Sequence, residues 1–204
     1  ETHLRMPVQA FDALRHALDF ADASAVMRNV RMVKSEREID KIRHVCTLVS
    51  NAFDRAPKLF AEGQSDIEAF RAFKLECLRQ GVDDVSYLVG GAGPGGYGDI
   101  ISPPAGRALG RGDVLILDTG CVYDGYFSDF DRNFAIGAAD DAARRAYDTV
   151  YRATEAGLAA ARPGATSAEL FGAMQTVLEA GGALGNAVGR LGHGLGSELT
   201  EPPS

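Results

Sequence analysis

Cysteine is scarce in this chain and widely scattered. The three cysteines, Cys46, Cys77 and Cys121, form no Cys-x-x-Cys pair, which argues against a metal site built from thiolates. Unpaired cysteines are typical of proteins in a reducing compartment, where disulfides rarely persist. We therefore expect reduced thiols and a cytoplasmic location.

Long apolar runs and clusters of basic residues are also missing. No apolar run approaches the roughly 20 residues that a membrane helix requires, and the sequence shows no secretory signal. The net charge is −7 without a run of Lys or Arg, which argues against a nucleic-acid surface. We expect neither a membrane nor a nucleic acid as a partner. The composition, 46% hydrophobic and 24% charged over 204 residues, predicts one sizeable globular domain.

The two ends of the chain lack features that a complete protein usually shows. The chain starts at Glu1 rather than at Met. It stops at "TEPPS", directly after a glycine-rich segment and without a closing helix or strand. We therefore expect an internal piece of a longer protein.

Helices are predicted in both halves of the chain from apolar residues at helical spacing. The predicted elements are a short helix over 8–20, a strand or linker over 24–33, long helices from Ser35 to about 61 and over 139–161, shorter helices from Ser65 to about 79 and from Thr166 to about 180, and a strand at "VSYLVGG". Three of the helices open with Ser or Thr followed three residues later by Glu, which is the pattern of a capping box.

Two of these helix pairs resemble each other. "AEGQSDIEAFRAF" and "ARPGATSAELFGAM" carry Gly, Ser or Thr, Glu and Phe at matching places, 101 residues apart. Helix pairs commonly share caps, which is one explanation. We favour the other, an internal duplication of a helix–helix–strand unit about a pseudo-twofold axis, with a site between the two copies.

Four aspartates interrupt a predicted pair of β-strands. Asp118 ends an apolar strand, and the alternation in "GYFSDFDRNFAIG" places Asp129 and Asp131 on one face. "YDGY", which contains Asp124, predicts a hairpin turn because Asp-Gly accepts positive φ. A hairpin closed there would bring Asp118 and Asp129 together at its open end. Paired carboxylates stay ionised only beside a positive charge, and a divalent metal ion commonly supplies it. The alternative is a solvated surface hairpin with Asp131 beside Arg132.

One histidine has a setting unlike that of the other three. His3, His16 and His44 lie on or beside predicted helices, whereas His193 lies between glycines in "RLGHGLGSELTEPP". Glycine lets the backbone approach a partner closely, and neutral imidazole is a common metal ligand. His193 is therefore a candidate ligand, with an incidental histidine in a glycine-rich loop as the alternative.

Together these segments resemble the pita-bread metallopeptidase family, which includes methionine aminopeptidase, aminopeptidase P, prolidase and creatinase. The motifs are "DTGCVYDGYFSDFDR", "GHGLGSELTEPP" and, for the prolidase and creatinase branch, "RMVKSEREIDKIRHV". The resemblance implies an α+β pita-bread fold, a pseudo-twofold duplication around a curved antiparallel sheet, truncated at the carboxyl end. Residues 28–204 would be part of the catalytic domain, and residues 1–27 the tail of an amino-terminal domain with its linker.

The resemblance also implies a site for two divalent metal ions, Mn, Co, Zn or Fe. Asp118 would bind one ion, Asp129 would bridge both, and His193 would bind the other. Two ions so placed share a hydroxide and polarise a carbonyl group. Two further glutamate ligands of the family would lie beyond residue 204, so we expect metal binding to be weak or absent in this piece. Members of this branch are often homodimers, which the resemblance implies here.

The chain departs from the family where the peptidases handle protons. Ile101 and Thr200 stand where the peptidases have histidines, and neither side chain is an acid near pH 7. Asp131 replaces a threonine, and we interpret it as an outer-shell partner, a third ligand or an ion-pair partner of Arg132. Glu198 and Glu201, with Asp131, are further candidates for an acid or base, and the alternative for the two glutamates is a solvent-facing position. Tyr97 and Asp99, with Ile101 and Thr200, are candidate substrate contacts.

We therefore expect a metal-dependent hydrolase of the Xaa-Pro dipeptidase or aminopeptidase type, which cleaves a C–N bond in a dipeptide or small molecule. The two replaced histidines motivate two alternatives. One is a lyase or small-molecule amidohydrolase on the same metal scaffold. The other is a binding homologue without catalytic activity.

Overall fold

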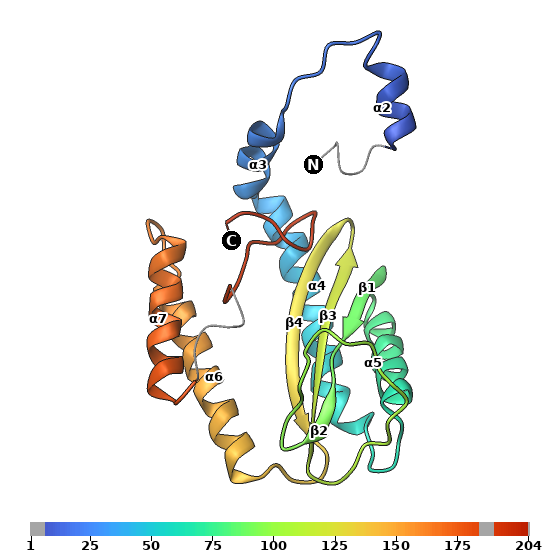
Figure 1. Cartoon of the computed structure of the whole chain (residues 1–204), viewed down its shortest axis with the longest axis vertical. Helices are drawn as coiled ribbons and strands as arrows, with labels where there is room; N and C mark the ends of the chain where they lie inside the picture. Colours follow the sequence, from blue (N-terminus) through green and yellow to red (C-terminus); the bar gives the residue numbers. More distant parts are fainter. Residues whose placement is uncertain (1–6, 184–189, 204) are drawn as a thin grey trace.

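The computed structural model describes residues 7–183 and 190–203. In chain order its elements are α2 (Val8–Leu14), α3 (Ser24–Met32), α4 (Glu36–Arg55), the 3-10 helix η1 (Ala56–Lys58), α5 (Asp66–Gln80), β1 (Asp84–Val89), β2 (Ala92–Pro94), β3 (Asp113–Tyr123), β4 (Tyr126–Ala135), α6 (Asp141–Ala160) and α7 (Ser167–Ala180). Helices α2 and α3 extend away from the body that holds the sheet (Figure 1).

An antiparallel sheet of four strands lies at the centre of that body. β1 and β2 follow each other along one edge of β3, and β4 pairs with the other edge. The β3–β4 hairpin turns at Asp124 and Gly125, whose φ values are 48° and 79°. Both values lie in the left-handed region that Asp and Gly tolerate best. The predicted hairpin and its turn are therefore confirmed.

Helices α4 and α5 cover one face of the sheet, and the core lies between these helices and the sheet. Its largest fully buried apolar side chains are Phe73, Leu109, Leu115, Leu117, Val45 and Val49. Because side chains alternate along a strand, the residues of β3 that enter this core leave Asp118 and Gly120 on the opposite face. The packing of the core therefore determines which face carries the aspartates.

The capping boxes are confirmed, while two predictions near the amino terminus need correction. The helix predicted over 8–20 is present only as α2, and residues 24–33 form helix α3 rather than a strand or linker. The Asp22 side chain accepts the Ser24 N–H at 2.8 Å, which satisfies a free donor of the first turn of α3. The long helix ends at Arg55 instead of near residue 61, because Pro57 opens a 3-10 turn there.

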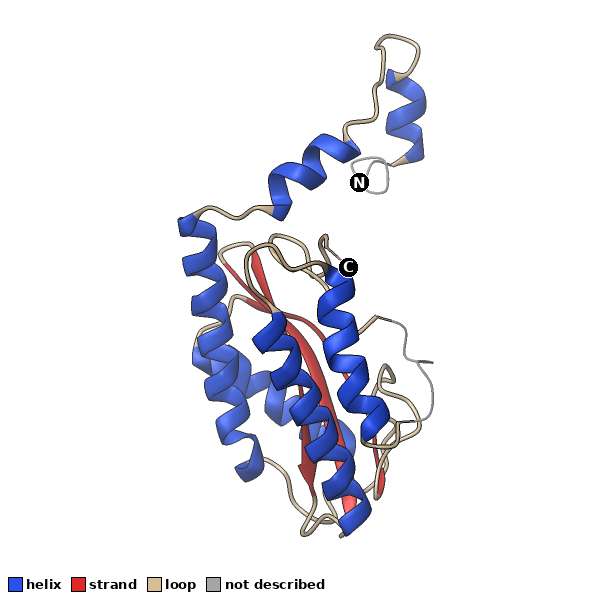
Figure 2. Ribbon diagram, turned by 90° about the vertical axis from the view of Figure 1, so that its left-hand side faces the viewer, coloured by secondary structure: helices blue, strands red, loops and turns tan. Residues whose placement is uncertain are grey.

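Helices α6 and α7 form a second pair beside the hairpin, on a different side from α4 (Figures 1 and 2). They pack closely, since a Cβ on Gly157 would lie 2.7 Å from the Met174 sulfur. Within residues 7–183 and 190–203, no helix combines the length and apolar character needed to span a bilayer. The boundary predicted at residue 27 falls inside α3, and the division into two domains remains a prediction.

Candidate metal centre

The hairpin brings three aspartates to one face of the sheet. Asp118 of β3 pairs directly with Asp131 of β4, and Gly120 pairs with Asp129. Because paired residues in antiparallel strands share a face, all three carboxylates project to the side away from the helix-covered core. The predicted approach of Asp118 to Asp129 is confirmed, but it lies in the middle of the hairpin. The open end is the pair of Val114 with Ala135.

A tyrosine from the neighbouring strand joins two of these aspartates. The Tyr87 hydroxyl lies 2.8 Å from Asp118 Oδ1 and 2.5 Å from Asp129 Oδ1. Tyr87 pairs with Gly120, where a Cβ would come within 2.4 Å of the tyrosine ring. The ring can therefore lie across β3 only because residue 120 has no side chain.

The hydroxyl of Tyr87 has one proton and faces two carboxylates, so it can donate to only one of them at a time. Burial raises the pKa of Asp118 to about 6, with repulsion from Asp129 and Asp131 adding to burial and the Tyr87 hydrogen bond and His193 opposing it. Burial and the two carboxylates also raise the pKa of Tyr87. Both shifts are relieved by a positive charge placed between the carboxylates.

His193 extends this chain of contacts on the other side of Asp129. Its Nε2 lies 3.0 Å from Asp129 Oδ2, and its Nδ1 lies 2.8 Å from the Gly194 carbonyl oxygen. A carbonyl oxygen only accepts, so Nδ1 carries a proton. Nε2 and the carboxylate oxygen would then present lone pairs to each other, unless a second proton or a metal ion lies between them. The predicted ligands Asp118, Asp129 and His193 are thus brought together in one chain of contacts.

The glycines around His193 let the loop approach its own backbone. A Cβ on Gly194 would lie 2.6 Å from the Pro202 carbonyl oxygen, and one on Gly196 would lie 2.6 Å from a Glu201 carboxylate oxygen. The Gly196 carbonyl also accepts the Phe127 N–H of β4 at 2.8 Å. The close partner expected for these glycines is therefore the segment 201–203 and the start of β4.

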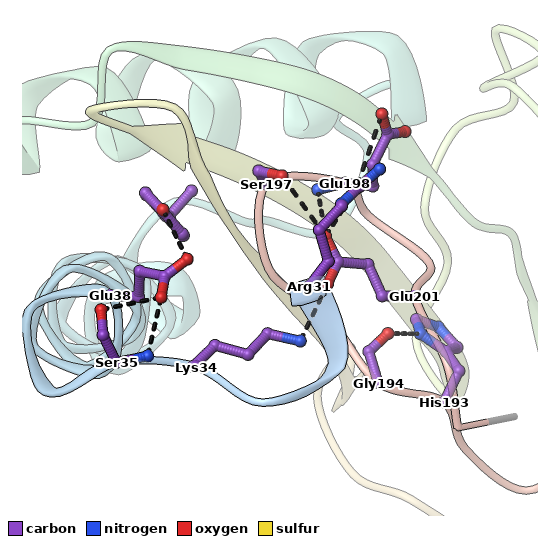
Figure 3. A network of polar contacts seen from close by, with 10 residues as sticks. Arg31, Lys34, Ser35, Glu38, His193, Gly194, Ser197, Glu198 and Glu201 are labelled. Atoms are coloured by element: carbon purple, nitrogen blue, oxygen red, sulfur yellow. Dashed lines mark hydrogen bonds and ion pairs between the residues drawn. The ribbon is translucent and has the colours of Figure 1, made fainter. Parts of the chain in front are cut away.

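Glu201 faces the interior rather than solvent. Its side chain accepts from Arg31 Nη2 at 2.7 Å and from Lys34 Nζ at 2.8 Å (Figure 3). Burial raises the pKa of Glu201, but the hydrogen bonds from Lys34 and Arg31 outweigh burial, so the pKa lies below its usual value. Glu198, half-buried, lies 3.6 Å from the same Arg31 nitrogen. The solvent-facing position considered for Glu201 is therefore corrected.

The four expected substrate contacts are placed differently from one another. The Tyr97 hydroxyl donates to Asn133 Oδ1 at 2.8 Å, which brings a second glycine-rich loop, residues 90–99, to the face of the sheet that carries the three aspartates. Asp99 accepts from the Ile101 N–H and the Ser102 hydroxyl, so its contacts lie within its own loop. Ile101 is 70% exposed, and the Thr200 hydroxyl lies 3.5 Å from an Arg190 nitrogen. Their role with substrate remains a prediction.

Asp131 has a different setting from its two neighbours. Among the described ion pairs, none joins its carboxylate to Arg132, whose Nη1 instead donates to the Asp131 main-chain carbonyl at 2.6 Å. Desolvation raises the pKa of Asp131, with Arg132 opposing and Asp129 adding to this shift. The ion-pair interpretation is therefore corrected, and the two metal-related interpretations remain predictions.

The donors present fit a divalent cation, although they do not enclose one. Carboxylates with one imidazole suit Mn, Fe, Co or Zn. Burial raises the pKa of Asp118 and repulsion from Asp129 and Asp131 adds to this shift, so a cation beside these carboxylates would be favourable. In the parts of the chain that the structure describes, no three His, Cys, Asp or Glu side chains lie close enough to hold a metal ion together. The set is therefore a partial ligand set.

Sequence reasoning missed Tyr87 and the basic partners of Glu201. A signal for Tyr87 was present, because a glycine inside a strand, here Gly120, often marks the close approach of another group. Arg31 and Lys34 lie about 170 residues from Glu201 in the chain, and no local pattern predicts such a contact.

Comparison with known proteins agrees with these observations. The family model described as "Metallopeptidase family M24" matches residues 40–204. The chain is 32% identical over 197 residues to "Probable dipeptidase PepE" of Mycobacterium tuberculosis, covering 92% of this chain and 52% of that protein. It is 28% identical over 206 residues to "Xaa-Pro dipeptidase" of Pyrococcus furiosus, covering 96% and 56%. The structure of dipeptidase PepE from Mycobacterium ulcerans matches at 29% identity with a TM-score of 0.84, covering 97% and 54%.

These matches confirm the resemblance inferred from the motifs and the predicted pita-bread fold, within the part of the fold that is present. The chain spans about half the length of the curated relatives that it matches.

Proposed function

Because the chain belongs to metallopeptidase family M24, we propose that it takes part in hydrolysing a dipeptide of the Xaa-Pro type at a centre of two divalent metal ions. The observation that carries this proposal is the chain of contacts from Asp118 through Tyr87 and Asp129 to His193. Among the described residues, no Lys or Arg side chain pairs with either aspartate. A relative named Xaa-Pro dipeptidase supports the substrate class.

Three side chains would hold the metal ions. Asp118 would supply an oxygen ligand to one ion, Asp129 would supply oxygens to both, and His193 Nε2 would supply a nitrogen. When bound, such ions provide a nucleophile from water near neutral pH and polarise the carbonyl group of the substrate.

Two other groups would keep these ligands in place. The Tyr87 hydroxyl contacts both aspartates, which limits the rotation of each carboxylate. The Gly194 carbonyl holds the proton of His193 on Nδ1, which leaves the Nε2 lone pair directed toward Asp129. Outer groups that fix ligand orientation in this way strengthen metal binding.

The substrate would lie against the aspartate face beside Tyr97. The Tyr97 hydroxyl donates to Asn133 there. Burial raises the pKa of Tyr97, and the nearby carboxylate of Asp131 adds a smaller increase. Asp131 and Glu198 are the acid or base candidates that we retain. Glu201 is a weaker candidate than either, because two cations hold it ionised.

A second candidate function follows from Ile101 and Thr200. Neither residue supplies an acid at the two places where the peptidases have histidines. This absence favours a lyase or amidohydrolase reaction on the same metal scaffold, or a homologue that binds without turnover. Product analysis separates these alternatives from peptide hydrolysis.

The test is a metal count followed by a substrate assay on the protein expressed from its complete gene, which would supply the two further glutamate ligands that the family resemblance implies. Inductively coupled plasma mass spectrometry after loading with Mn, Co, Zn or Fe should give about two ions per chain. Incubation with Ala-Pro and Met-Pro should then release free proline. Asp129→Asn should remove both signals, and Asp124→Asn, which changes the exposed turn aspartate, should leave both. Two bound ions without any proline would reject the dipeptidase, and no bound ion would reject the metal centre.

The cytoplasmic location and the homodimer belong to the same proposal. All three cysteines are free, and Cys77 and Cys121 are buried, which suits a reducing compartment. Sedimentation equilibrium should show twice the mass of one chain.

A further inference from the structure

A buried ion-pair cluster connects the loop of His193 with the junction of α3 and α4. Arg31 lies in the last turn of α3, and Lys34 lies between the two helices. Their nitrogens lie 2.7 and 2.8 Å from the two carboxylate oxygens of Glu201, which is 3% exposed (Figure 3). The Glu198 N–H also donates to this carboxylate at 3.0 Å.

The backbone of Glu201 continues this connection to His193. The Glu201 N–H donates to the Gly194 carbonyl at 2.8 Å, and the same carbonyl lies 2.8 Å from His193 Nδ1. The Gly194 N–H donates in turn to the Pro203 carbonyl at 2.8 Å. The carbonyl that holds the His193 proton is therefore held by the residue that Arg31 and Lys34 anchor.

We propose that Arg31, Lys34 and Glu201 form a positioning unit for His193, an inference that rests on the proposed role of His193 as a metal ligand. The two cations fix the Glu201 side chain, and its N–H fixes the direction of the Gly194 carbonyl. That carbonyl keeps the ring proton on Nδ1 and turns Nε2 toward Asp129. Glu201 thus acts on the site through Gly194 and is not the acid or base of the reaction.

The glycines of the loop make this arrangement sensitive to small movements. Gly196 lies against the Glu201 carboxylate, and Gly194 lies against the Pro202 carbonyl, with no room for a Cβ at either place. The other side of the loop is held by the Phe127 N–H, two residues before Asp129. A displaced Glu201 would therefore move the Gly194 carbonyl relative to an otherwise fixed β4.

The test compares two buried glutamates in the protein expressed from its complete gene. Glu76 is the matched control, since it is 5% exposed and pairs with Arg55 of α4 at 3.0 Å, and among the described residues no polar contact joins it to the loop. With 15N-labelled histidine and no metal, the His193 Nδ1–H cross-peak should be sharp in the wild type and in Glu76→Gln. It should be broadened or lost in Glu201→Gln and in Arg31→Met, and Arg31→Lys should restore it in part.

A second readout uses Co²⁺ alone as the probe. Outer groups that orient a ligand typically change metal affinity about 10–100-fold, so Glu201→Gln should weaken Co²⁺ binding by that factor and alter the visible absorption bands of the complex. Glu76→Gln should bind within about twofold of the wild type, even if both variants lower the melting temperature.

The outcomes separate this inference from the proposed function. An unchanged His193 cross-peak in Glu201→Gln, with proline still released by the wild type, would overturn the positioning unit alone. If the cross-peak is lost in Glu201→Gln and the wild type releases no proline, the positioning unit is supported and the dipeptidase is rejected. If Glu201→Gln does not fold, Arg31→Met and Lys34→Met carry the same comparison, and two unchanged cross-peaks there would overturn the inference.

Discussion

Two carboxylates on opposite faces of strand β3, those of Asp113 and Asp118, differ in the number of donors around them and in the direction of their pKa shifts. Asp113, at the start of β3, is 1% exposed, accepts from Arg107 at 2.5 and 2.9 Å, and accepts from the Gly110 N–H at 2.7 Å. The hydrogen bonds from Arg107 outweigh burial and keep the pKa of Asp113 below its usual value. Asp118, five residues further along the same strand, has only the shared Tyr87 hydroxyl as a donor among the described residues, and its pKa is raised to about 6.

This difference distinguishes a carboxylate that supports the fold from one that serves the site. A buried carboxylate with its own guanidinium or N–H donors is stable as an anion. One that shares a single proton with a second carboxylate gains when a cation arrives from solution. The core therefore fixes the position of the face that carries Asp118 and Asp129, while the negative charge of this face would be neutralised by a cation from solution.

The largest effect is expected on metal binding from Asp129→Asn. Loss of an outer group costs about 10–100-fold in metal affinity, so loss of the proposed bridging ligand should cost more than about 100-fold. The same change removes repulsion with Asp118, so the metal-free chain should be no less stable. Isothermal titration with Mn²⁺ and urea unfolding, both on the protein expressed from its complete gene, measure the two quantities. Equal metal affinity in Asp129→Asn and wild type would reject the ligand role.

Asp113→Asn should give the opposite pattern. Breaking a buried ion pair costs about 3–5 kcal/mol, and the partly exposed Arg107 reduces this to about 2–3 kcal/mol of unfolding free energy. Mn²⁺ affinity should stay within about threefold of the wild type. If the two variants lose similar amounts of unfolding free energy and similar factors of Mn²⁺ affinity, the distinction between the two kinds of carboxylate is wrong.

Local patterns account for the parts of the site that were predicted. Alternation with a period of two placed Asp129 and Asp131 on one face, and Asp-Gly at the turn determined the register that brings Asp118 beside them. The capping boxes at Ser65 and Thr166 were predicted for the same reason, because both partners lie three residues apart.

Contacts between distant segments account for what was missed. Residues 24–33 carry β-branched Val and no capping box, so the sequence pattern favours a strand or linker, whereas Arg31 of α3 pairs with Glu201 from the opposite end of the chain. Glu201 was considered solvent-facing because "TEPP" gives no sign of the two cations that bury it. Tyr87 lies in an apolar strand and reaches the aspartates only through the pairing of β1 with β3.

Gly120→Ala tests whether Tyr87 must lie across β3. The new Cβ would meet the Tyr87 ring at 2.4 Å and a Leu199 methyl group at 2.9 Å, and overpacking of this kind costs about 1–3 kcal/mol. Displacing the ring should also weaken Mn²⁺ binding. The control is Gly172→Ala in α7, where a Cβ meets nothing within 4 Å. This substitution should stabilise the helix by about 0.5–1 kcal/mol. Equal stability of both variants in urea would show that Tyr87 is not confined there.

The smallest effect expected is the pH dependence contributed by Asp118. Its folded pKa of about 6 lies above the unfolded value, so its contribution to stability is present below about pH 4 and is lost as the pH rises through 6. Asp118→Asn has no such group. In chelator-treated protein, the variant should therefore gain about 1–2 kcal/mol relative to the wild type between pH 4 and 7, after allowance for partial solvent screening. Urea unfolding at pH 4, 5.5 and 7 measures this difference. A difference that stays constant with pH would mean that Asp118 already has a cation within the protein, and that the contrast with Asp113 does not hold.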